Sequence, residues 1–208
     1  MNHSLITPTR PGWHGARALR WMRLLALGLM LAVNGSAKLH AEPVESAAAL
    51  EYEVKGAFLV KFGMFVEWSS NAPTGGDKGV FMIGILGADP FGSRYDELVS
   101  KEKVGGRHIQ IKRGQTPAEL SECQIVFIST SESARLPTVL AEFTGKGVLT
   151  VSDEPGFASR GGMIGFIKES GKVRFEINTR AAEQAGLKVS SKLLQVGKRV
   201  SGEAPAQG

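Results

Sequence analysis

Three apolar runs, each close to a glycine or a polar turn, constrain the fold most strongly. They occupy residues 79–87 (GVFMIGILG), 124–129 (QIVFIS) and 147–152 (GVLTVS). A run without strict alternation is typical of a strand that is covered on both faces. Helices are expected after the first two runs: over 89–100, where Asp89 would be the cap and Pro90 the first helical residue, and over 131–143, where apolar residues have helical spacing. This order predicts an α/β fold with parallel strands and helical crossovers.

Further elements complete the expected domain. Residues 107–112 alternate polar and apolar and should form a strand nearer an edge of the sheet. Two strands, 163–168 and 173–178, flank the turn ESGK and predict an antiparallel hairpin. Helices are expected over 45–68, 179–185 and 190–200. We therefore expect a three-layer sandwich, Rossmann-like or flavodoxin-like, with a mixed sheet and a C-terminal antiparallel hairpin.

The positive charge of the chain lies in its first 41 residues. The formal net charge is +5, but residues 42–208 hold 20 basic and 20 acidic residues. Residues 1–41 combine a basic region ending at Arg23, the apolar run 24–33 and a small polar stretch, which predicts a Sec signal peptide cleaved after Ala37 or Ala41. The run is shorter than the roughly 20 residues that span a membrane, and an uncleaved anchor is the alternative.

This pattern predicts one mature α/β domain over residues 42–200, followed by a flexible tail over 201–208. The domain should reside in the periplasm of a Gram-negative bacterium. Its balanced charge and its compartment give no reason to expect a nucleic-acid partner.

The mature domain offers few catalytic groups. His108 is its only histidine away from the N-terminus, and there is no G-x-S-x-G turn, so we expect neither an enzyme nor a cofactor nor a metal site. Cys123 is the only cysteine and therefore stays unpaired within the chain. It could act as a redox thiol or bridge two molecules, but the simpler interpretation is a small, half-buried apolar residue.

Polar residues follow the three buried strands. Ligands of parallel α/β sheets bind beyond the carboxyl ends of the strands, where hydroxyls and helix N-termini would suit an anion or a polar small molecule. Local roles explain the same residues: a helix cap for Asp89, a capping box for Ser129 with Glu132 and a turn for Asp153. The candidates for a small-ligand site are Asp89, Ser129, Ser131, Glu132, Ser152 and Asp153.

The helix expected over 45–68 has one aromatic face. The face consists of Phe58, Phe62, Phe65 and Trp68. These side chains either pack into the core or form an apolar patch that holds a partner protein. The long helix also offers a self-complementary surface on which a homodimer could form.

Taken together, these segments resemble the YfiR family. The resemblance covers almost all of the mature chain in the right order. The matching segments are Tyr52–Trp68, Gly87–Gly92, Gly106-Arg107, Cys123 before its strand, Ile128–Glu132, Leu149–Asp153, Gly156–Ala158, Gly161–Phe166, Val173–Asn178 and Ala185–Leu194.

The resemblance implies a periplasmic α/β regulator that represses an inner-membrane diguanylate cyclase by binding its periplasmic sensor domain. Such binding would lower cyclic-di-GMP and restrain biofilm formation. Family members that respond to redox state use paired cysteines, whereas this chain has Cys123 alone. The alternative is a periplasmic sensor that binds a small ligand at the strand ends.

Overall fold

The computed structural model describes residues 46–70, 72–74 and 79–202. The predicted signal peptide, residues 1–41, lies outside the described residues, as does most of the predicted tail, residues 203–208. The described residues from 46 onward belong to one structural unit.

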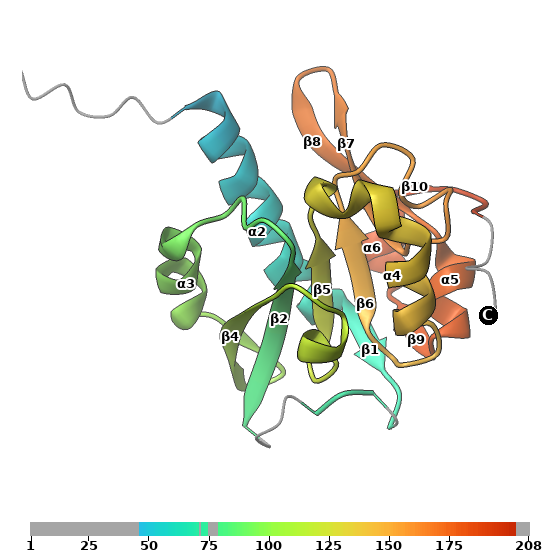
Figure 1. The fold of residues 1–208 in the computed structure, drawn as a ribbon, viewed down its shortest axis with the longest axis horizontal. Helices are drawn as coiled ribbons and strands as arrows, with labels where there is room; N and C mark the ends of the chain where they lie inside the picture. Colours follow the sequence, from blue (N-terminus) through green and yellow to red (C-terminus); the bar gives the residue numbers. More distant parts are fainter. Residues whose placement is uncertain (1–45, 71, 75–78, 203–208) are drawn as a thin grey trace, which may run out of the picture. The chain divides into compact units, whose positions relative to one another are not determined.

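The centre of the fold is an eight-stranded mixed sheet with the order β10-β8-β7-β6-β5-β2-β4-β3 (Figure 1). Neighbouring strands β4, β2, β5, β6 and β7 run parallel, and β8 returns antiparallel to β7 as the predicted hairpin. The short strands β3 and β10 form the two edges. The strands are β2 (Val80–Leu86), β3 (Lys103–Val104), β4 (Arg107–Gly114), β5 (Ile125–Ile128), β6 (Leu149–Ser152), β7 (Ile164–Glu169), β8 (Lys172–Ile177) and β10 (Lys198–Arg199).

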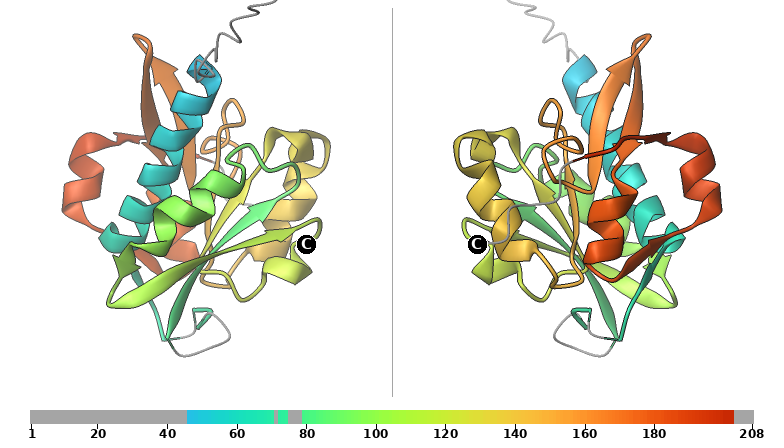
Figure 2. Two further views of the ribbon diagram at one scale, coloured as in Figure 1. Left: turned by 90° about the vertical axis from the view of Figure 1, so that its left-hand side faces the viewer. Right: turned by 90° about the vertical axis from the view of Figure 1, so that its right-hand side faces the viewer.

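Helices cover both faces of the sheet, which confirms the three-layer α/β sandwich. Helices α2 and α3 lie on one side and α4 lies on the other (Figure 2). Because β5 alternates, Ile125 and Phe127 belong to the core cluster of α2 and α3, while Val126 and Ile128 belong to that of α4. The helices are α2 (Ala47–Phe65), α3 (Ser93–Ser100), α4 (Leu136–Phe143), α5 (Thr179–Gln184) and α6 (Ser191–Val196), with 3₁₀ helices η1 (Ala118–Leu120) and η2 (Thr130–Arg135).

The helix expected over 45–68 is shorter than its apolar spacing indicates. Helix α2 ends at Phe65, and the next three residues form strand β1 (Val66–Trp68). Strand β1 pairs antiparallel with β9 (Leu187–Val189) in a separate two-stranded sheet. The last expected helix, 190–200, likewise ends at Val196, because the chain then extends to add β10 to the sheet.

Helices α2 and α3 approach closely at a glycine. A Cβ atom on Gly56 would lie 2.6 Å from the Tyr95 ring, so a larger residue would push α3 away from α2. The Tyr95 hydroxyl donates a hydrogen bond to the Gly56 carbonyl at 2.9 Å. Burial raises the pKa of Tyr95, so its hydroxyl remains a donor.

Candidate functional site

The carboxyl ends of the buried strands lie at the same end of the sheet, as the sequence predicts. Strands β2, β5 and β6 are parallel neighbours, so the residues that follow them converge. The pleat then separates these residues. Asp153 continues the alternation of Leu149 and Val151 toward α2, whereas the Ser152 side chain bonds toward β5. The six candidate residues therefore do not form a single cluster.

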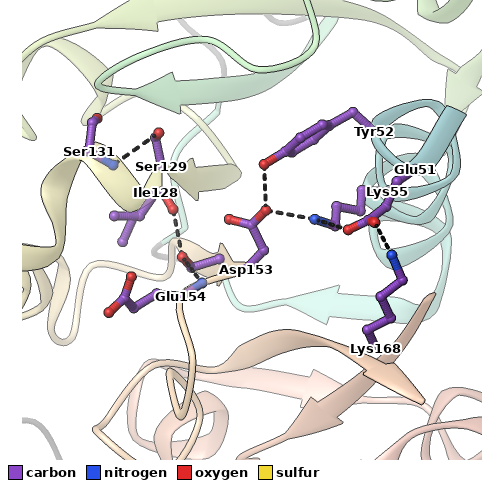
Figure 3. A network of polar contacts seen from close by, with 10 residues as sticks. Glu51, Tyr52, Lys55, Ile128, Ser129, Ser131, Asp153, Glu154 and Lys168 are labelled. Atoms are coloured by element: carbon purple, nitrogen blue, oxygen red, sulfur yellow. Dashed lines mark hydrogen bonds and ion pairs between the residues drawn. The ribbon is translucent and has the colours of Figure 1, made fainter. Parts of the chain in front are cut away.

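Asp153 is the centre of a network with α2 (Figure 3). Its Oδ2 accepts hydrogen bonds from the Tyr52 hydroxyl at 2.8 Å and from Lys55 Nζ at 2.7 Å. Lys55 Nζ also lies 2.8 Å from Glu51 Oε1, and Lys168 of β7 lies 2.9 Å from Glu51 Oε2. The side chains of Lys55 and Asp153 are only 6% and 9% exposed. The network therefore connects three elements, α2, the end of β6 and the hairpin.

The charges of this network balance. Two lysines face two carboxylates, and Lys55 Nζ lies 4.2 Å from the centre of the Tyr52 ring. Hydrogen bonds from Lys55 and Lys168 hold the pKa of Glu51 below its usual value. Burial, and then the hydrogen bond to Asp153, raise the pKa of Tyr52, which keeps its hydroxyl protonated. This arrangement suits a structural link between α2 and the sheet.

On the other side of the strand ends, the serines satisfy backbone groups. Ser129 Oγ accepts from the Ser131 amide at 3.3 Å, and Ser131 Oγ accepts from the Ala88 amide at 3.0 Å. Ser152 Oγ donates to the Ile128 carbonyl at 2.6 Å and accepts from the Glu154 amide at 3.0 Å. Buried Glu132 pairs with Arg135.

Only one half of the predicted capping box is present. Ser129 is the N-cap of η2, as the local interpretation indicates. Glu132 does not complete the box, because its carboxylate pairs with Arg135 and the Ser129 amide donates to the Leu86 carbonyl. Gly87, directly after β2, packs against Ser131. A Cβ atom on Gly87 would come 2.4 Å from Ser131 Oγ, so this close approach requires glycine.

Asp89 is not the cap of the following helix, so that expectation is wrong. Helix α3 begins at Ser93, with Gly92 as its N-cap. Asp89 Oδ1 accepts from the Phe91 amide at 2.8 Å, and Oδ2 pairs with Arg113 Nε at 2.7 Å. Arg113 of β4 also pairs with Asp96 of α3 at 2.6 Å. A cation from a neighbouring strand thus holds the carboxylate in the loop before the helix.

The aromatic face divides between core and surface. Phe62 is fully buried and its ring contacts Phe166 and Phe175, so the core interpretation describes this residue. Phe58, Phe65 and Trp68 are half-buried. Phe58 lines an open groove of about 440 Å³ between α2 and the β7–β8 hairpin. The lining residues are Ala47, Leu50, Glu51, Val54, Phe58, Lys168, Gly171, Lys172 and Val173.

Sequence reasoning missed Tyr52, Lys55 and Arg113. A signal for Lys55 was present, because it precedes Leu59 by four residues and Phe62 by seven on one helical stripe. A lysine on a stripe that is otherwise buried needs an acidic partner. No local pattern links Arg113 to Asp89, since the contact joins β4 to the loop after β2.

The remaining single residues have simple surroundings. His108 is exposed on β4. Cys123 is fully buried rather than half-buried, and this burial raises its pKa to about 12. Within residues 46–70, 72–74 and 79–202, no group of three or more His, Cys, Asp or Glu side chains could hold a metal ion. In the same residues, no helix is long and apolar enough to cross a membrane.

The fold and the strand-end geometry define a three-layer α/β domain whose polar groups at the strand ends bond mainly to backbone groups and to charged or hydroxyl side chains of the same chain. The comparison with protein families then gives its relatives. The model of the YfiR/HmsC-like family matches residues 52–198, and the chain belongs to this family, whose members are periplasmic regulators. The comparison with curated proteins gave no match.

Proposed function

We propose that this protein is a non-enzymatic regulator that represses an inner-membrane diguanylate cyclase by binding its periplasmic sensor domain. In this proposal the Sec pathway exports the chain, and the signal peptide is removed after Ala37 or Ala41. Repression lowers cyclic-di-GMP and restrains biofilm formation. The family supports regulation at a general level, and the groove between α2 and the β7–β8 hairpin is the observation that carries the choice of a protein partner.

The groove has the properties of a protein-binding surface. Leu50 and Val54 on α2 are 48% and 45% exposed, so two large apolar side chains on successive helical turns are accessible beside each other. The start of α2 and the tip of the β7–β8 hairpin both project beyond the ends of the other strands, which makes them accessible to a large partner (Figure 1). Phe58 is half-buried and also lines the groove, so it would serve as an aromatic anchor for the partner.

The charge at the rim indicates the chemistry of the partner. Lys168 and Lys172 both line the groove, and the side chain of Lys168 is 63% exposed. Glu51 is the only carboxylate among the lining residues of this groove. A segment of the sensor domain that presents apolar side chains flanked by carboxylates would complement this surface.

The test compares two surface substitutions in a strain that lacks the gene. Deletion should raise cyclic-di-GMP and biofilm, and the wild-type protein should restore both. Leu50→Asp should fail to restore them, because it places a carboxylate in the apolar groove. Val196→Asp on α6 is the matched control, since Val196 is 60% exposed but lies on another element. It should act like the wild-type protein.

Affinity purification of the exported protein from solubilised membranes tests the partner directly. A diguanylate cyclase should co-purify with the wild-type protein and with Val196→Asp, but not with Leu50→Asp. Unchanged cyclic-di-GMP on deletion, together with no co-purified cyclase, would overturn the proposal.

The small-ligand alternative has less support from the geometry. Most polar atoms of Asp89, Ser129, Ser131, Glu132, Ser152 and Asp153 already bond within the chain. A thermal-shift screen of polar metabolites tests this alternative. A metabolite that stabilises the wild-type protein but not Ser131→Ala would favour it, because Ser131 is exposed.

A further inference from the structure

We infer that a cavity at the amino ends of β2, β4 and β5 binds a small organic carboxylate. Its oxygens accept hydrogen bonds from the guanidinium of Arg107 and from the indole N–H of Trp68. The start of β2 lies at the lower end of the view in Figure 1 and the tip of the β7–β8 hairpin at the upper end, so this cavity is separate from the groove of the proposed function. The inference goes beyond that function, because it requires no cyclase.

The cavity lies where three strands begin. Its volume is about 300 Å³. Arg107 is the first residue of β4, Gln124 directly precedes β5, and Trp68 ends β1, from which residues 69, 70 and 72–74 lead toward β2. This volume is at the lower end of the range for small-molecule sites, so the ligand should have few non-hydrogen atoms.

Two hydrogen-bond donors at this cavity have no acceptor within the described residues. Trp68 Nε1 is buried and makes no hydrogen bond. Arg107 is half-buried, and no carboxylate in the described part of the chain pairs with it. Nearly all buried donors in native proteins are paired, so an acceptor from outside the chain would satisfy the indole N–H. An oxyanion offers acceptors to both donors at once.

One buried ring holds both donors. Phe81 of β2 is fully buried, and the ring of Trp68 meets it edge to face with the centroids 5.4 Å apart. The Cζ atom of Arg107 lies 5.1 Å from the centroid of the same ring. Because these contacts restrict both side chains before a ligand arrives, binding loses less conformational entropy.

Acceptors in the wall of the cavity are already engaged. Gln124 is 1% exposed, and its Oε1 accepts a hydrogen bond from the Met82 amide at 2.6 Å. Its Nε2 donates to the Pro73 carbonyl at 2.6 Å, which fixes the loop at Pro73 against β2. These two acceptors are therefore taken, whereas the donors of Arg107 and Trp68 remain open.

The charge of the wall selects an anion, and its apolar part selects an organic one. Arg107 is the only charged residue among the lining residues, all of which belong to the described part of the chain. A guanidinium binds a carboxylate through two parallel hydrogen bonds. The indole of Trp68, with Ala72 and Pro73, offers apolar surface to the rest of the ligand. Inorganic phosphate has no apolar part that could use this surface.

Trp68 supplies the signal for the test. The other two tryptophans, Trp13 and Trp21, lie in the predicted signal peptide, so the exported protein has a single indole N–H resonance. Benzoate is the probe, and it should shift this resonance saturably in proton–nitrogen correlation spectra. Acetate and inorganic phosphate, which lack the apolar part, should bind about tenfold more weakly, and so should benzamide, which lacks the charge.

Substitutions test the two donors separately. Arg107→Gln should weaken benzoate binding by about tenfold or more, because it removes the positive charge. The matched control is Arg199→Gln, the same change at an exposed arginine on β10, an edge strand remote from β4 in the sheet order. It should bind benzoate like the wild-type protein. Trp68→Phe keeps an aromatic ring beside Phe81 but removes the N–H, and calorimetry should show binding about fivefold weaker.

The outcomes separate this inference from the proposed function. An indole resonance that millimolar benzoate leaves unchanged would overturn the inference. So would equal affinity of the wild-type protein and folded Arg107→Gln for benzoate, or phosphate binding as tight as that of benzoate. Circular dichroism confirms that each variant folds, and the ligand series on the wild-type protein decides the question if one does not. Leu50→Asp should bind benzoate normally, since Leu50 lines the other groove, so either proposal can fail alone.

Discussion

Two ion-pair clusters attach two helices to the strand ends, and they differ in their access to water. Lys55 links α2 to Asp153 at 2.7 Å with both side chains less than a tenth exposed. Arg113 of β4 pairs with Asp89 in the loop before α3 at 2.7 Å and with Asp96 of α3 at 2.6 Å, but the side chains of Arg113, Asp89 and Asp96 are 38%, 18% and 41% exposed. The chemistry and the distances are alike, so the difference between the clusters is burial.

Burial changes what each cluster contributes to stability. A buried ion pair gives little net stability, because removing two charges from water offsets their attraction, yet removing one partner leaves a buried charge uncompensated. An exposed pair is screened by water and salt, and its loss matters little. Attachment of α2 therefore depends on both partners together, whereas attachment of α3 tolerates the loss of one.

The largest expected effect is that of Asp153→Asn. The substitution keeps the shape of the side chain but removes the charge that compensates Lys55, so the free energy of unfolding should fall by about 3–5 kcal/mol. Urea denaturation followed by circular dichroism measures this change. A loss below about 1 kcal/mol would mean that Glu51 alone compensates Lys55, and the contrast between the clusters would disappear.

The next prediction sharpens the comparison through a double-mutant cycle. Lys55→Met combined with Asp153→Leu removes both buried charges, and the double variant should be within about 1–2 kcal/mol of the wild-type protein. The hydroxyl of Tyr52 then loses its acceptor, which accounts for about 1 kcal/mol of that difference. Losses that simply add in the double variant would contradict the coupling of this pair.

Arg113→Gln should have a smaller effect. The exposed cluster should contribute no more than about 1 kcal/mol to the free energy of unfolding, and the effect should shrink further in 1 M salt, where the Debye length is about 3 Å. Denaturation at low and high salt measures both quantities. A loss as large as that of Asp153→Asn, independent of salt, would show that burial is not what distinguishes the clusters.

The smallest expected effect is a response to acid that both clusters share. Hydrogen bonds from Lys55 and Lys168 hold the pKa of Glu51 below its usual value, and hydrogen bonds from Arg113 do the same for the pKa of Asp96. Carboxyl groups with a lowered pKa contribute stability that is present above the unfolded pKa and is lost as pH falls through the folded pKa. NMR titration should show the pKa of Glu51 rising in Lys168→Gln and unchanged in Lys192→Gln.

Much of the fold follows from local patterns in the sequence. The apolar runs around β2, β5 and β6 could be recognised because burial on both faces leaves an unbroken apolar stretch. Strands β1, β9 and β10 have three, three and two residues and could not, because pairing with distant segments defines them rather than their own composition. The continued helical spacing through Val66 concealed the change to a strand.

The site was predictable in its location but not in its connections. The topology brings the strand ends together as expected, because neighbouring parallel strands have their carboxyl ends at the same end of the sheet. The partners of Asp153 lie about a hundred residues earlier, on α2, and no sequence spacing encodes that contact. Only the position of Lys55 on a buried stripe indicated that an acidic group would be needed there.

The buried cysteine provides a natural probe of local opening in this protein. Cys123 is the only thiol in the chain, has no exposed surface, and its pKa is raised to about 12. An electrophilic reagent, which the thiolate attacks, can therefore modify Cys123 only in molecules whose α4-side core cluster has opened transiently. The rate of modification therefore reports how often the core cluster around Cys123 opens, and the measurement needs no engineered label.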